Sequence, residues 1–240
     1  MLLYDPKYSH IKAKVLRIFK RMNSELCIPF TVNHQLVGFM FLGKKSNLKN
    51  YTLEDIDFLE MLRSPIAIAI NNSITYSMAI TDPLTGLYNR YFLFHLLEKE
   101  INKCKRYSNV LTLMFVDMDY LKKLNDIYGH RIGDICLKEL AKEILKNTRD
   151  SDICVRYGGD EFLVLMPNTT IKGALAASSR LLRSIQRKIV RVDGKKIKIS
   201  VSIGVAQYDH RFKNYNELLI MVDKALYKAK LKGRNRVEIM

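Results

Sequence analysis

The chain has 240 residues, 48% of them hydrophobic, so its length predicts one large domain or two small ones with an ordinary apolar core. Its net charge of +16 would suit a nucleic acid, an anionic membrane or a polyanionic small ligand, but the lysines are spread rather than clustered with aromatic residues. A solvated lysine-rich surface explains most of that charge. We therefore expect no nucleic-acid partner and, since every apolar run is too short to cross a bilayer, no membrane span.

The four cysteines are scattered and form no C-x-x-C pair, so they indicate neither a zinc site nor a disulfide framework: Cys27, Cys104, Cys136 and Cys154. A reducing compartment is the simpler setting for such thiols. The N-terminus has no basic segment followed by an apolar one, so we expect no secretory signal peptide. The sequence therefore predicts a cytoplasmic location.

The first part of the chain predicts a helix, a hairpin and a second, longer helix. Residues 1 to about 25 have the imperfect apolar face of a basic amphipathic helix, and strand-like runs follow at residues 27–32 and 35–42. Thr52 and Asp55 have the spacing of a capping box and open a helix that runs towards residue 76. Pro65 interrupts this helix and predicts a kink or a restart there.

This hairpin and its exit helix resemble the last part of a GAF sensor domain. The roughly 80 residues are too few for a whole GAF domain, whose earlier strands and ligand pocket are not visible in the sequence. We therefore assign residues 1–80 to a partial GAF-like α/β sensor segment that acts through a connecting helix. Two such helices could pair as a coiled coil, or each could pack alone on its own hairpin, and the heptad pattern is too irregular to decide.

Pro83 and Gly86 mark a turn segment at which a second domain, residues 81–240, begins. Asn89 can cap the helix that follows, and a buried strand then ends at Asp117. The later elements are a turn segment up to Gly129, a helix through 137–145, a hairpin over 153–166, a helix over about 170–188, a half-buried strand over 197–205, a helix between Asn214 and Gly233, and an edge strand over 236–239. This order predicts an α+β fold in which helices flank one mostly antiparallel sheet.

The Gly158-Gly159 pair lies between two apolar runs and predicts a β-hairpin with a tight two-residue turn, because glycine takes positive φ without steric penalty. Two adjacent acids, Asp160 and Glu161, follow it directly. Carboxylates that close repel each other unless a cation neutralises them, and hard cations such as Mg²⁺ take oxygen ligands. If the strand ending at Asp117 lies beside this hairpin, the three carboxylates form a two-cation site of the kind used in phosphoryl and nucleotidyl transfer. A solvated acidic turn is the alternative.

Several ordered motifs stand out over residues 81–240: Asp82-Pro-Leu-Thr-Gly-Leu-Tyr-Asn-Arg90, Asp117-Met-Asp-Tyr-Leu-Lys-Lys-Leu-Asn-Asp126, Tyr-Gly-His130, Gly133-Asp134, Arg-Tyr-Gly-Gly-Asp-Glu-Phe162 and Ala225-Leu-Tyr-Lys-Ala-Lys230. Together they resemble the GGDEF family of diguanylate cyclases. The resemblance implies a nucleotide-cyclase and polymerase-palm-like fold, and a reaction that joins two GTP molecules into cyclic di-GMP, a signalling molecule, with release of pyrophosphate. Leu121 departs from the family, which usually has phenylalanine there, and we expect a small effect because both residues are apolar.

The same resemblance implies a Mg²⁺ site, with Mn²⁺ as the other candidate ion. Asp117, the backbone carbonyl of Met118 and Glu161 would hold the metal. Asp160 would also serve the metal and would help to deprotonate the attacking 3′-hydroxyl. A role for Asp117 as a plain strand-end cap is the alternative, but a buried strand that ends in two acids favours the metal.

The guanine base would be read by Asn125 and Asp134. Asp134 would accept hydrogen bonds from guanine N1–H and the exocyclic amine, and adenine offers no matching pair of donors. Gly158 and Gly159 would let the triphosphate or the ribose lie against the backbone. The alternative for Asn125 is that it only forms a turn.

Three cations would neutralise the triphosphate, and the first of them counts among the catalytic residues: Lys122, Lys230 and Arg234. Any helix end tolerates cations such as the last two, and without the family resemblance that would be the favoured interpretation.

Arg149 and Asp152 form an Arg-x-x-Asp pair, with five residues between it and Gly158, where the family has its product-inhibition site. Arginine can bind phosphate or guanine with two hydrogen bonds, and aspartate can accept from guanine. An exposed ion pair between them, which would contribute little, is the alternative. Arg180 on the next helix is a weaker candidate for a second contact with the inhibitor.

The resemblance implies that GTP is the substrate, that cyclic di-GMP is both product and inhibitor, and that activity needs a homodimer, since each domain binds one GTP. A catalytically weak cyclic di-GMP receptor is the main alternative, although a pure receptor has no need of the three acids. A basic nucleic-acid binder is a third possibility that rests on net charge alone.

Overall fold

The computed structural model describes residues 17–18 and 21–240, and the basic helix predicted over residues 1 to about 25 lies largely outside them. The chain divides into two compact units, with the boundary between Ala79 and Ile80. Each unit has hydrophobic core residues of its own. The assignment of the first unit to a GAF-like sensor stays a prediction.

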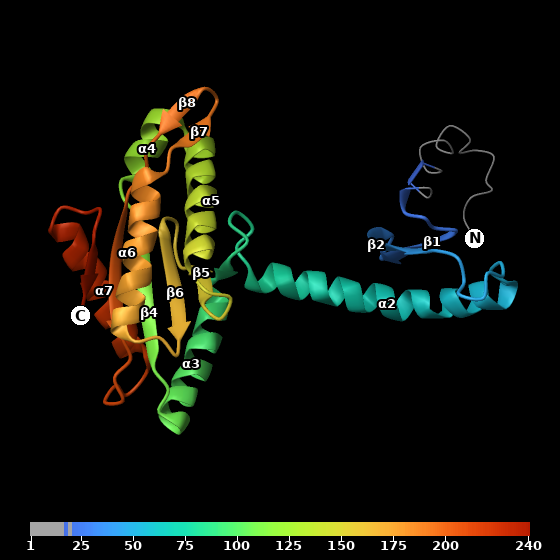
Figure 1. Cartoon of the computed structure of the whole chain (residues 1–240), viewed down its shortest axis with the longest axis horizontal. Coiled ribbons are helices and arrows are strands. Elements are labelled where there is room, and N and C mark those ends of the chain that lie inside the picture. Colours follow the sequence, from blue (N-terminus) through green and yellow to red (C-terminus); the bar gives the residue numbers. More distant parts are fainter. Residues whose placement is uncertain (1–16, 19–20) are drawn as a thin grey trace. The chain divides into compact units, whose positions relative to one another are not determined.

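Among the described residues, the main elements of the first unit are a two-stranded hairpin and one long helix (Figure 1). Strands β1 (Leu26–Val32) and β2 (Gln35–Leu42) pair antiparallel. Asn33 and His34 form the turn between them with φ of 48° and 65°, and a left-handed pair of this kind matches the twist of the two strands. Helix α2 (Leu53–Ile80) packs on the hairpin over a small core that contains Ile28, Phe30 and Ala67.

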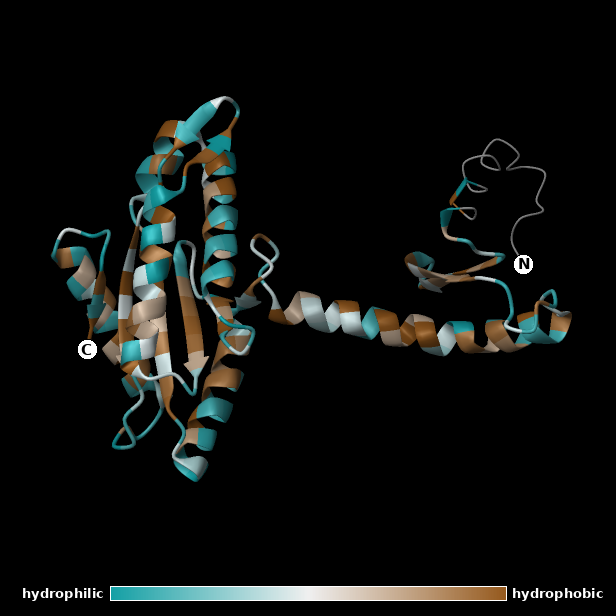
Figure 2. Ribbon diagram, viewed as in Figure 1, coloured by the Kyte–Doolittle hydropathy of each residue, from teal (hydrophilic) through white to brown (hydrophobic). Residues whose placement is uncertain are grey.

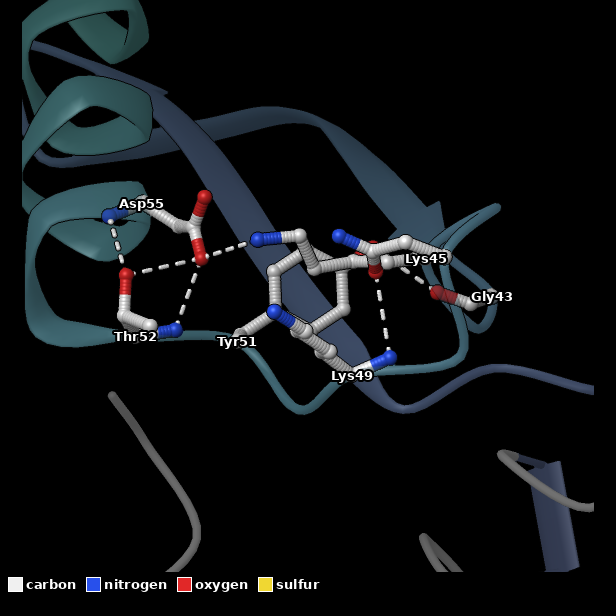
Figure 3. Close-up of polar contacts among 7 residues, drawn as sticks. Gly43, Lys45, Lys49, Tyr51, Thr52 and Asp55 are labelled. Atoms are coloured by element: carbon white, nitrogen blue, oxygen red, sulfur yellow. Dashed lines mark hydrogen bonds and ion pairs between the residues drawn. The ribbon is translucent and has the colours of Figure 1, made fainter.

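Helix α2 begins with the capping box that the sequence predicts (Figure 3). The Thr52 N–H donates to Asp55 Oδ2 at 2.7 Å, and the Asp55 N–H donates to Thr52 Oγ1 at 3.3 Å. Lys45 Nζ donates to the same Asp55 oxygen at 2.6 Å. The hydrogen bonds from Lys45 and Thr52 lower the pKa of Asp55 to about 2, so this cap is charged at neutral pH.

Pro65 lies inside α2, which runs without interruption from Leu53 to Ile80, so the restart predicted at this proline is wrong. An internal proline removes one backbone hydrogen bond and costs about 3 kcal/mol. The residues on both sides of it pack against the hairpin and offset that cost: Leu59, Ile66, Ala67 and Ile70.

The second unit is built on a six-stranded sheet in the order β10-β9-β4-β6-β5-β3. The two central strands are β4 (Leu111–Met118) and β6 (Glu161–Pro167), which pair antiparallel. The other strands of this sheet are β3 (Tyr88–Asn89), β5 (Ile153–Arg156), β9 (Val201–Gln207) and β10 (Val237–Ile239). Only the two edge pairs, β3 with β5 and β9 with β10, are parallel, so the prediction of a mostly antiparallel sheet is confirmed.

Helices cover both faces of this sheet (Figure 1). Met114, Val116 and Met118 of β4 face one core, which includes α5 (His130–Asn147) and α6 (Ile171–Arg187). Leu111, Leu113 and Phe115 of the same strand face the other core, which includes α3 (Arg90–Tyr107) and α7 (Tyr215–Leu231). Because both faces are covered, the central strands are mostly hydrophobic, whereas the helices carry hydrophilic residues on their outer sides (Figure 2).

The cap predicted at Asn89 is present, and Asn214 caps the helix that the sequence predicts after it. Asn89 accepts from the Phe92 N–H at 3.0 Å at the start of α3, and Asn214 accepts from the Asn216 N–H at 2.9 Å at the start of α7. Gly233, with φ of 103°, follows the end of α7 as predicted.

Two further sequence predictions, both in the second unit, are wrong. Residues after Asp119, predicted as a turn segment, form the eight-residue helix α4 (Leu121–Tyr128), whose Leu121 and Leu124 pack against the core that α5 and α6 share. The half-buried strand predicted over 197–205 is divided between β8 (Lys195–Ile197), which pairs only with β7 (Val190–Val192), and β9, whose first six residues are all buried. Helices cover both faces of β9 and bury it. The apolar residues at every second position in the sequence predict burial of one face alone.

Candidate active site

The predicted acids come together where β4 ends and β6 begins. Asp117, one residue before the end of β4, lies directly opposite Glu161, the first residue of β6, in the antiparallel register. The Met118 N–H donates to the Asp160 carbonyl at 3.0 Å, so the chain just before β6 also stays beside β4. The three acids therefore lie at one corner of the two central strands.

The glycine turn differs from the predicted one. Four residues, not two, separate β5 from β6, and neither Gly158 nor Gly159 has positive φ. The two glycines matter because they lack a side chain. A Cβ on Gly158 would lie 2.5 Å from Glu161 Oε2, while one on Gly159 would meet nothing within 4 Å. Gly158 thus leaves room for the Glu161 carboxylate, and Gly159 leaves an open backbone surface.

The electrostatics of the site are dominated by buried negative charge. Asp117 is 5% exposed, and Lys230 Nζ of α7 donates to its Oδ2 at 2.7 Å. Burial raises the pKa of Asp117 to about 6 against the lowering effect of Lys230, and Asp160 and Glu161 add to the rise. Burial and the charge of Asp160 likewise raise the pKa of Glu161. The positive charge around Asp117 and Glu161 is therefore too small to offset the cost of burying their negative charge.

The donor set fits a hard divalent cation that shares its coordination with a substrate. Within residues 17–18 and 21–240, no group of three or more His, Cys, Asp or Glu side chains could hold a metal ion by itself. Mg²⁺ keeps several waters and is usually bound by one or two carboxylates together with substrate phosphates, rather than by a cage made of protein alone. Asp117 and Glu161, oxygen donors with raised pKa values, match that requirement.

The residues predicted to read a base lie on α4 and at the start of α5. Asn125 packs so closely on Gly133 that a Cβ there would lie 1.9 Å from Asn125 Oδ1. In the described part of the chain this buried oxygen has no hydrogen-bond partner. Asp134, next to Gly133, is exposed. Among the described residues, the pair thus offers an unpaired amide oxygen and an exposed carboxylate.

The predicted cations come from two helices and a loop. Lys122 is exposed on α4, and Lys230 lies on Asp117 as described. Arg234, in the loop between α7 and β10, places its guanidinium 4.9 Å from the centre of the Tyr120 ring. Lys230 and Arg234 are therefore held near the end of β4 by separate contacts.

An ion pair that sequence reasoning missed supports the glycine turn. Arg156, at the end of β5, donates through one nitrogen to both oxygens of Asp82 at 3.1 Å and through another to the Gly159 carbonyl at 2.8 Å. Asp82 also accepts from the N–H and hydroxyl of Thr85. Burial alone would raise the pKa of Asp82, but these hydrogen bonds hold it below its usual value. Both residues belong to motifs that the sequence displays, but nothing in the sequence pairs them across 74 positions.

Asp119 and Arg90 were also missed. Asp119 is buried behind the site, where it accepts from Ser202 Oγ at 2.7 Å and from the Asn235 N–H at 3.2 Å. Arg90 lies 4.5 Å from the centre of the Tyr157 ring, and its charge acts on Glu161. The signal for Asp119 was its position as the second acid at the end of a buried strand.

The Arg-x-x-Asp segment forms a compact turn between α5 and β5. The Arg149 N–H donates to Asp152 Oδ2 at 2.8 Å, and the Asp152 N–H donates to the Arg149 carbonyl at 2.9 Å. Asp152 Oδ1 is buried and unpaired among the described residues. Arg180 donates to the Asn147 carbonyl at 2.6 Å, at the end of α5. Arg149 contacts Asp152 through its backbone N–H, and its exposed side chain forms no ion pair with Asp152 among the described residues, so the exposed ion pair is not the observed arrangement. Arg180 lies at the same corner.

Comparison with known proteins agrees with this geometry. The family model described as diguanylate cyclase, GGDEF domain, matches residues 79–236. Diguanylate cyclase A of Treponema denticola is 36% identical over 230 residues, which cover 94% of this chain and 62% of that protein. The chain thus spans less than two thirds of that relative.

Solved structures give the same result. Diguanylate cyclase SiaD of Pseudomonas aeruginosa, in complex with its activator SiaC, is 31% identical with a TM-score of 0.67, and the match covers 78% of this chain and 72% of that one. The GGDEF domain of DgcB of Caulobacter crescentus, in complex with c-di-GMP, is 26% identical with a TM-score of 0.65 and covers 67% of this chain and 95% of that one.

Proposed function

The chain belongs to the GGDEF family of diguanylate cyclases, and from this we propose that it condenses two GTP molecules into cyclic di-GMP and releases two pyrophosphates. The observation that carries the proposal is the pair of Asp117 and Glu161, directly opposite each other on the central strands and with raised pKa values. Among the described side chains, only Lys230 is bonded to the Asp117 carboxylate. A site with that excess of negative charge suits a cation-dependent reaction on a polyphosphate. GTP, a cytoplasmic nucleotide, agrees with the location predicted from the sequence.

We propose that Asp117, the Met118 carbonyl, Asp160 and Glu161 hold Mg²⁺, or Mn²⁺ in its place. The metal, when bound, neutralises charge on the triphosphate and on the attacking oxygen. Asp160 accepts the proton of the 3′-hydroxyl as that oxygen bonds to the α-phosphorus of the other GTP and pyrophosphate leaves. Lys122, Lys230 and Arg234 bind the triphosphate, and Gly159 leaves the backbone open to it.

The unpaired oxygen of Asn125 and the exposed carboxylate of Asp134 bind the guanine edge in this proposal. Asp134→Ala is expected to weaken GTP binding about tenfold and to narrow the preference for GTP over ITP, which lacks the exocyclic amine. Equilibrium binding of both nucleotides measures this. Asp126→Ala, which removes an exposed carboxylate on α4, is the matched control and should change neither affinity. An unchanged GTP-to-ITP ratio in Asp134→Ala would contradict the assignment.

Two copies of the chain must cooperate, because each domain holds one GTP and each 3′-hydroxyl attacks the nucleotide of the other copy. Helix α2 offers a surface for pairing. Phe58, Met61, Pro65 and Ile68 recur at alternating steps of three and four residues, and all four are exposed, while Leu59, Ile66 and Ala67 face the hairpin. Such spacing is that of a two-stranded coiled-coil seam, so we propose that the homodimer forms along it.

A charge placed in that seam tests the homodimer. Ile68→Glu is expected to shift the chain to monomers and to lower cyclase activity about tenfold or more at micromolar protein, because two buried glutamates would repel each other. Light scattering after size exclusion gives the mass. Ser73→Glu adds the same charge to the exposed surface of α2 outside the seam and should remain dimeric. Full activity in a monomeric Ile68→Glu protein would rule out the two-copy mechanism.

We further propose that the turn from Arg149 to Asp152 binds the product and inhibits the enzyme, with Arg180 as a second contact. The unpaired Asp152 Oδ1 supports this, since a guanine donor would satisfy it. Arg149→Ala is expected to raise the inhibitory cyclic di-GMP concentration about tenfold. Reaction progress with added product measures it, and Asp150→Ala, an exposed neighbour, is the control. Equal inhibition of Arg149→Ala and the unaltered protein would refute the site.

The experiment that tests the function is incubation of the purified chain with GTP and Mg²⁺, with the nucleotides separated by mass. Cyclic di-GMP that appears and then stalls supports both the cyclase and its inhibition. No product, together with cyclic di-GMP binding that Arg149→Ala abolishes, would make the chain a receptor. A version forced to dimerise by a fused coiled coil separates that result from an enzyme that failed to pair.

A further inference from the structure

Asp119 is a buried carboxylate for which the proposed reaction has no use. It is 6% exposed, and both of its oxygens are occupied: Ser202 Oγ donates to Oδ1 at 2.7 Å and the Asn235 N–H donates to Oδ2 at 3.2 Å. Its own N–H donates to the Ser200 carbonyl at 2.9 Å. A carboxylate so enclosed and so bonded is not placed to bind a ligand. Its contacts instead join the end of β4 to β9 and to the loop between α7 and β10.

The loop that Asp119 holds has an unfavourable backbone. Arg234 and Asn235 are consecutive residues with φ of 60° and 50°, in the left-handed region that non-glycine residues avoid. A pair of this kind persists only where surrounding contacts fix it. Besides Asp119, the described residues provide three such contacts: the Arg234 N–H donates to the Ala229 carbonyl at 3.0 Å, Gln186 Nε2 donates to Asn235 Oδ1 at 3.2 Å, and Arg236 Nε donates to the Arg234 carbonyl at 3.2 Å. Of these four bonds, the one to Asp119 is made to a carboxylate.

The same loop carries the arginine of the site. The Arg234 guanidinium lies 4.9 Å from the centre of the Tyr120 ring, and Tyr120, the residue after Asp119, is itself left-handed with φ of 61°. Three residues with left-handed backbone thus surround the buried carboxylate of Asp119. Tyr120 supplies the aromatic ring, Arg234 places its guanidinium near that ring, and Asn235 donates its backbone N–H to the carboxylate. The strain lies beside the end of β4, where the acids of the site meet.

We propose that Asp119 is a positioning residue for the triphosphate: by holding the Asn235 N–H, it fixes the left-handed turn that aims Arg234 across Tyr120 into the site. The inference rests on the proposed function, in which Arg234 binds the triphosphate. Asp119 touches neither substrate nor metal. It sets the affinity for the outer phosphates of GTP and leaves the guanine contacts and the chemical step alone.

Binding of two unreactive nucleotides tests this. One is GMP, and the other is a GTP analogue with a methylene bridge between the α- and β-phosphates. Asp119→Ala is expected to weaken the analogue about tenfold, since a hydrogen bond to a charged group is lost, and to leave GMP affinity unchanged. Asp119→Asn should stay near the unaltered protein, because its amide oxygen can accept from Asn235 while its NH₂ donates to Ser202. In kinetics, Asp119→Ala should raise KM for GTP and leave kcat unchanged.

A double-mutant cycle with Arg234→Ala decides whether Asp119 acts through the arginine. In that background Asp119→Ala should have no further effect on the analogue. The proposal would be overturned if the affinity losses of Asp119→Ala and Arg234→Ala multiplied in the double variant, or if Asp119→Ala weakened GMP as much as the analogue. Either result would leave the role of Arg234 unchanged. If Arg234→Ala itself binds the analogue normally, the triphosphate assignment fails and the proposal falls with it.

Two further variants keep the test decisive. Asp209→Ala removes another carboxylate whose bonds hold a loop, here to Arg211 after β9, and should bind both nucleotides normally. If Asp119→Ala does not fold, Ser202→Ala removes one of the two donors to Asp119 and should give the same selective loss for the analogue, smaller in size. Normal analogue binding by a folded Ser202→Ala would then count against the proposal.

Discussion

Glu161→Gln is expected to lower cyclase turnover on the order of a thousandfold, the size of effect seen when one group that stabilises transition-state charge is lost. Glutamine keeps the size of the side chain, its place opposite Asp117 and the room beside Gly158, but it removes the negative charge. The rate of pyrophosphate release at saturating GTP and Mg²⁺ measures the change. KM should move much less, because the proposed guanine contacts, Asn125 and Asp134, lie on α4 and α5.

The variant should also be folded, which separates a lost charge from a lost structure. Burial and Asp160 raise the pKa of Glu161, so its charge destabilises the metal-free protein, and the neutral amide should be at least as stable at pH 7. Glu98→Gln, an exposed neutralisation on α3, is the matched control and should keep full activity. Turnover in Glu161→Gln within a few-fold of the control would eliminate this residue from the metal site.

Local chemistry made parts of the fold predictable. The Thr52–Asp55 box and the Asn89 and Asn214 caps each depend on side chains within three residues of the helix start, so the sequence contains all of the interaction. The near-continuous apolar run of β4 likewise predicts a strand buried on both faces. Asp117 and Glu161 could be predicted as partners only through the family resemblance, since their register depends on the whole sheet.

Predictions failed where tertiary contacts outweigh local preference. Helix α4 forms because Leu121 and Leu124 find the core, although its eight residues contain Asn125 and Asp126, which favour turns. Gly158 was predicted to take positive φ in a tight turn, but the structure shows that it instead leaves room for the Glu161 side chain. The Lys230–Asp117 and Arg156–Asp82 pairs join residues 113 and 74 positions apart. A charge pattern cannot pair such residues, because many other partners at similar separations are equally compatible with the sequence.

The second prediction with a large effect concerns the free energy of unfolding. Whether removal of the Asp117 charge raises or lowers it follows from the pKa of Asp117. That pKa is about 6 in the folded chain against 3.8 for the ordinary group, so the folded protein binds this proton more tightly than the unfolded one. The stability it contributes is complete below about pH 4 and is lost as pH rises through about 6. The shift corresponds to about 3 kcal/mol at pH 7. Buried negative charge at this site therefore costs stability in the absence of metal.

Asp117→Asn is therefore expected to stabilise the metal-free protein at pH 7 by about 2 to 3 kcal/mol, since the shift already includes the attraction of Lys230, while abolishing turnover. Lys230 is 31% exposed and can be solvated instead. Urea unfolding in EDTA from pH 4.5 to 8 measures the difference, which should grow with pH. Mg²⁺ with the methylene GTP analogue should stabilise the unaltered protein more than the variant, since only the former binds the ion fully. A variant that is less stable at every pH would show that the Lys230 ion pair outweighs the burial of Asp117.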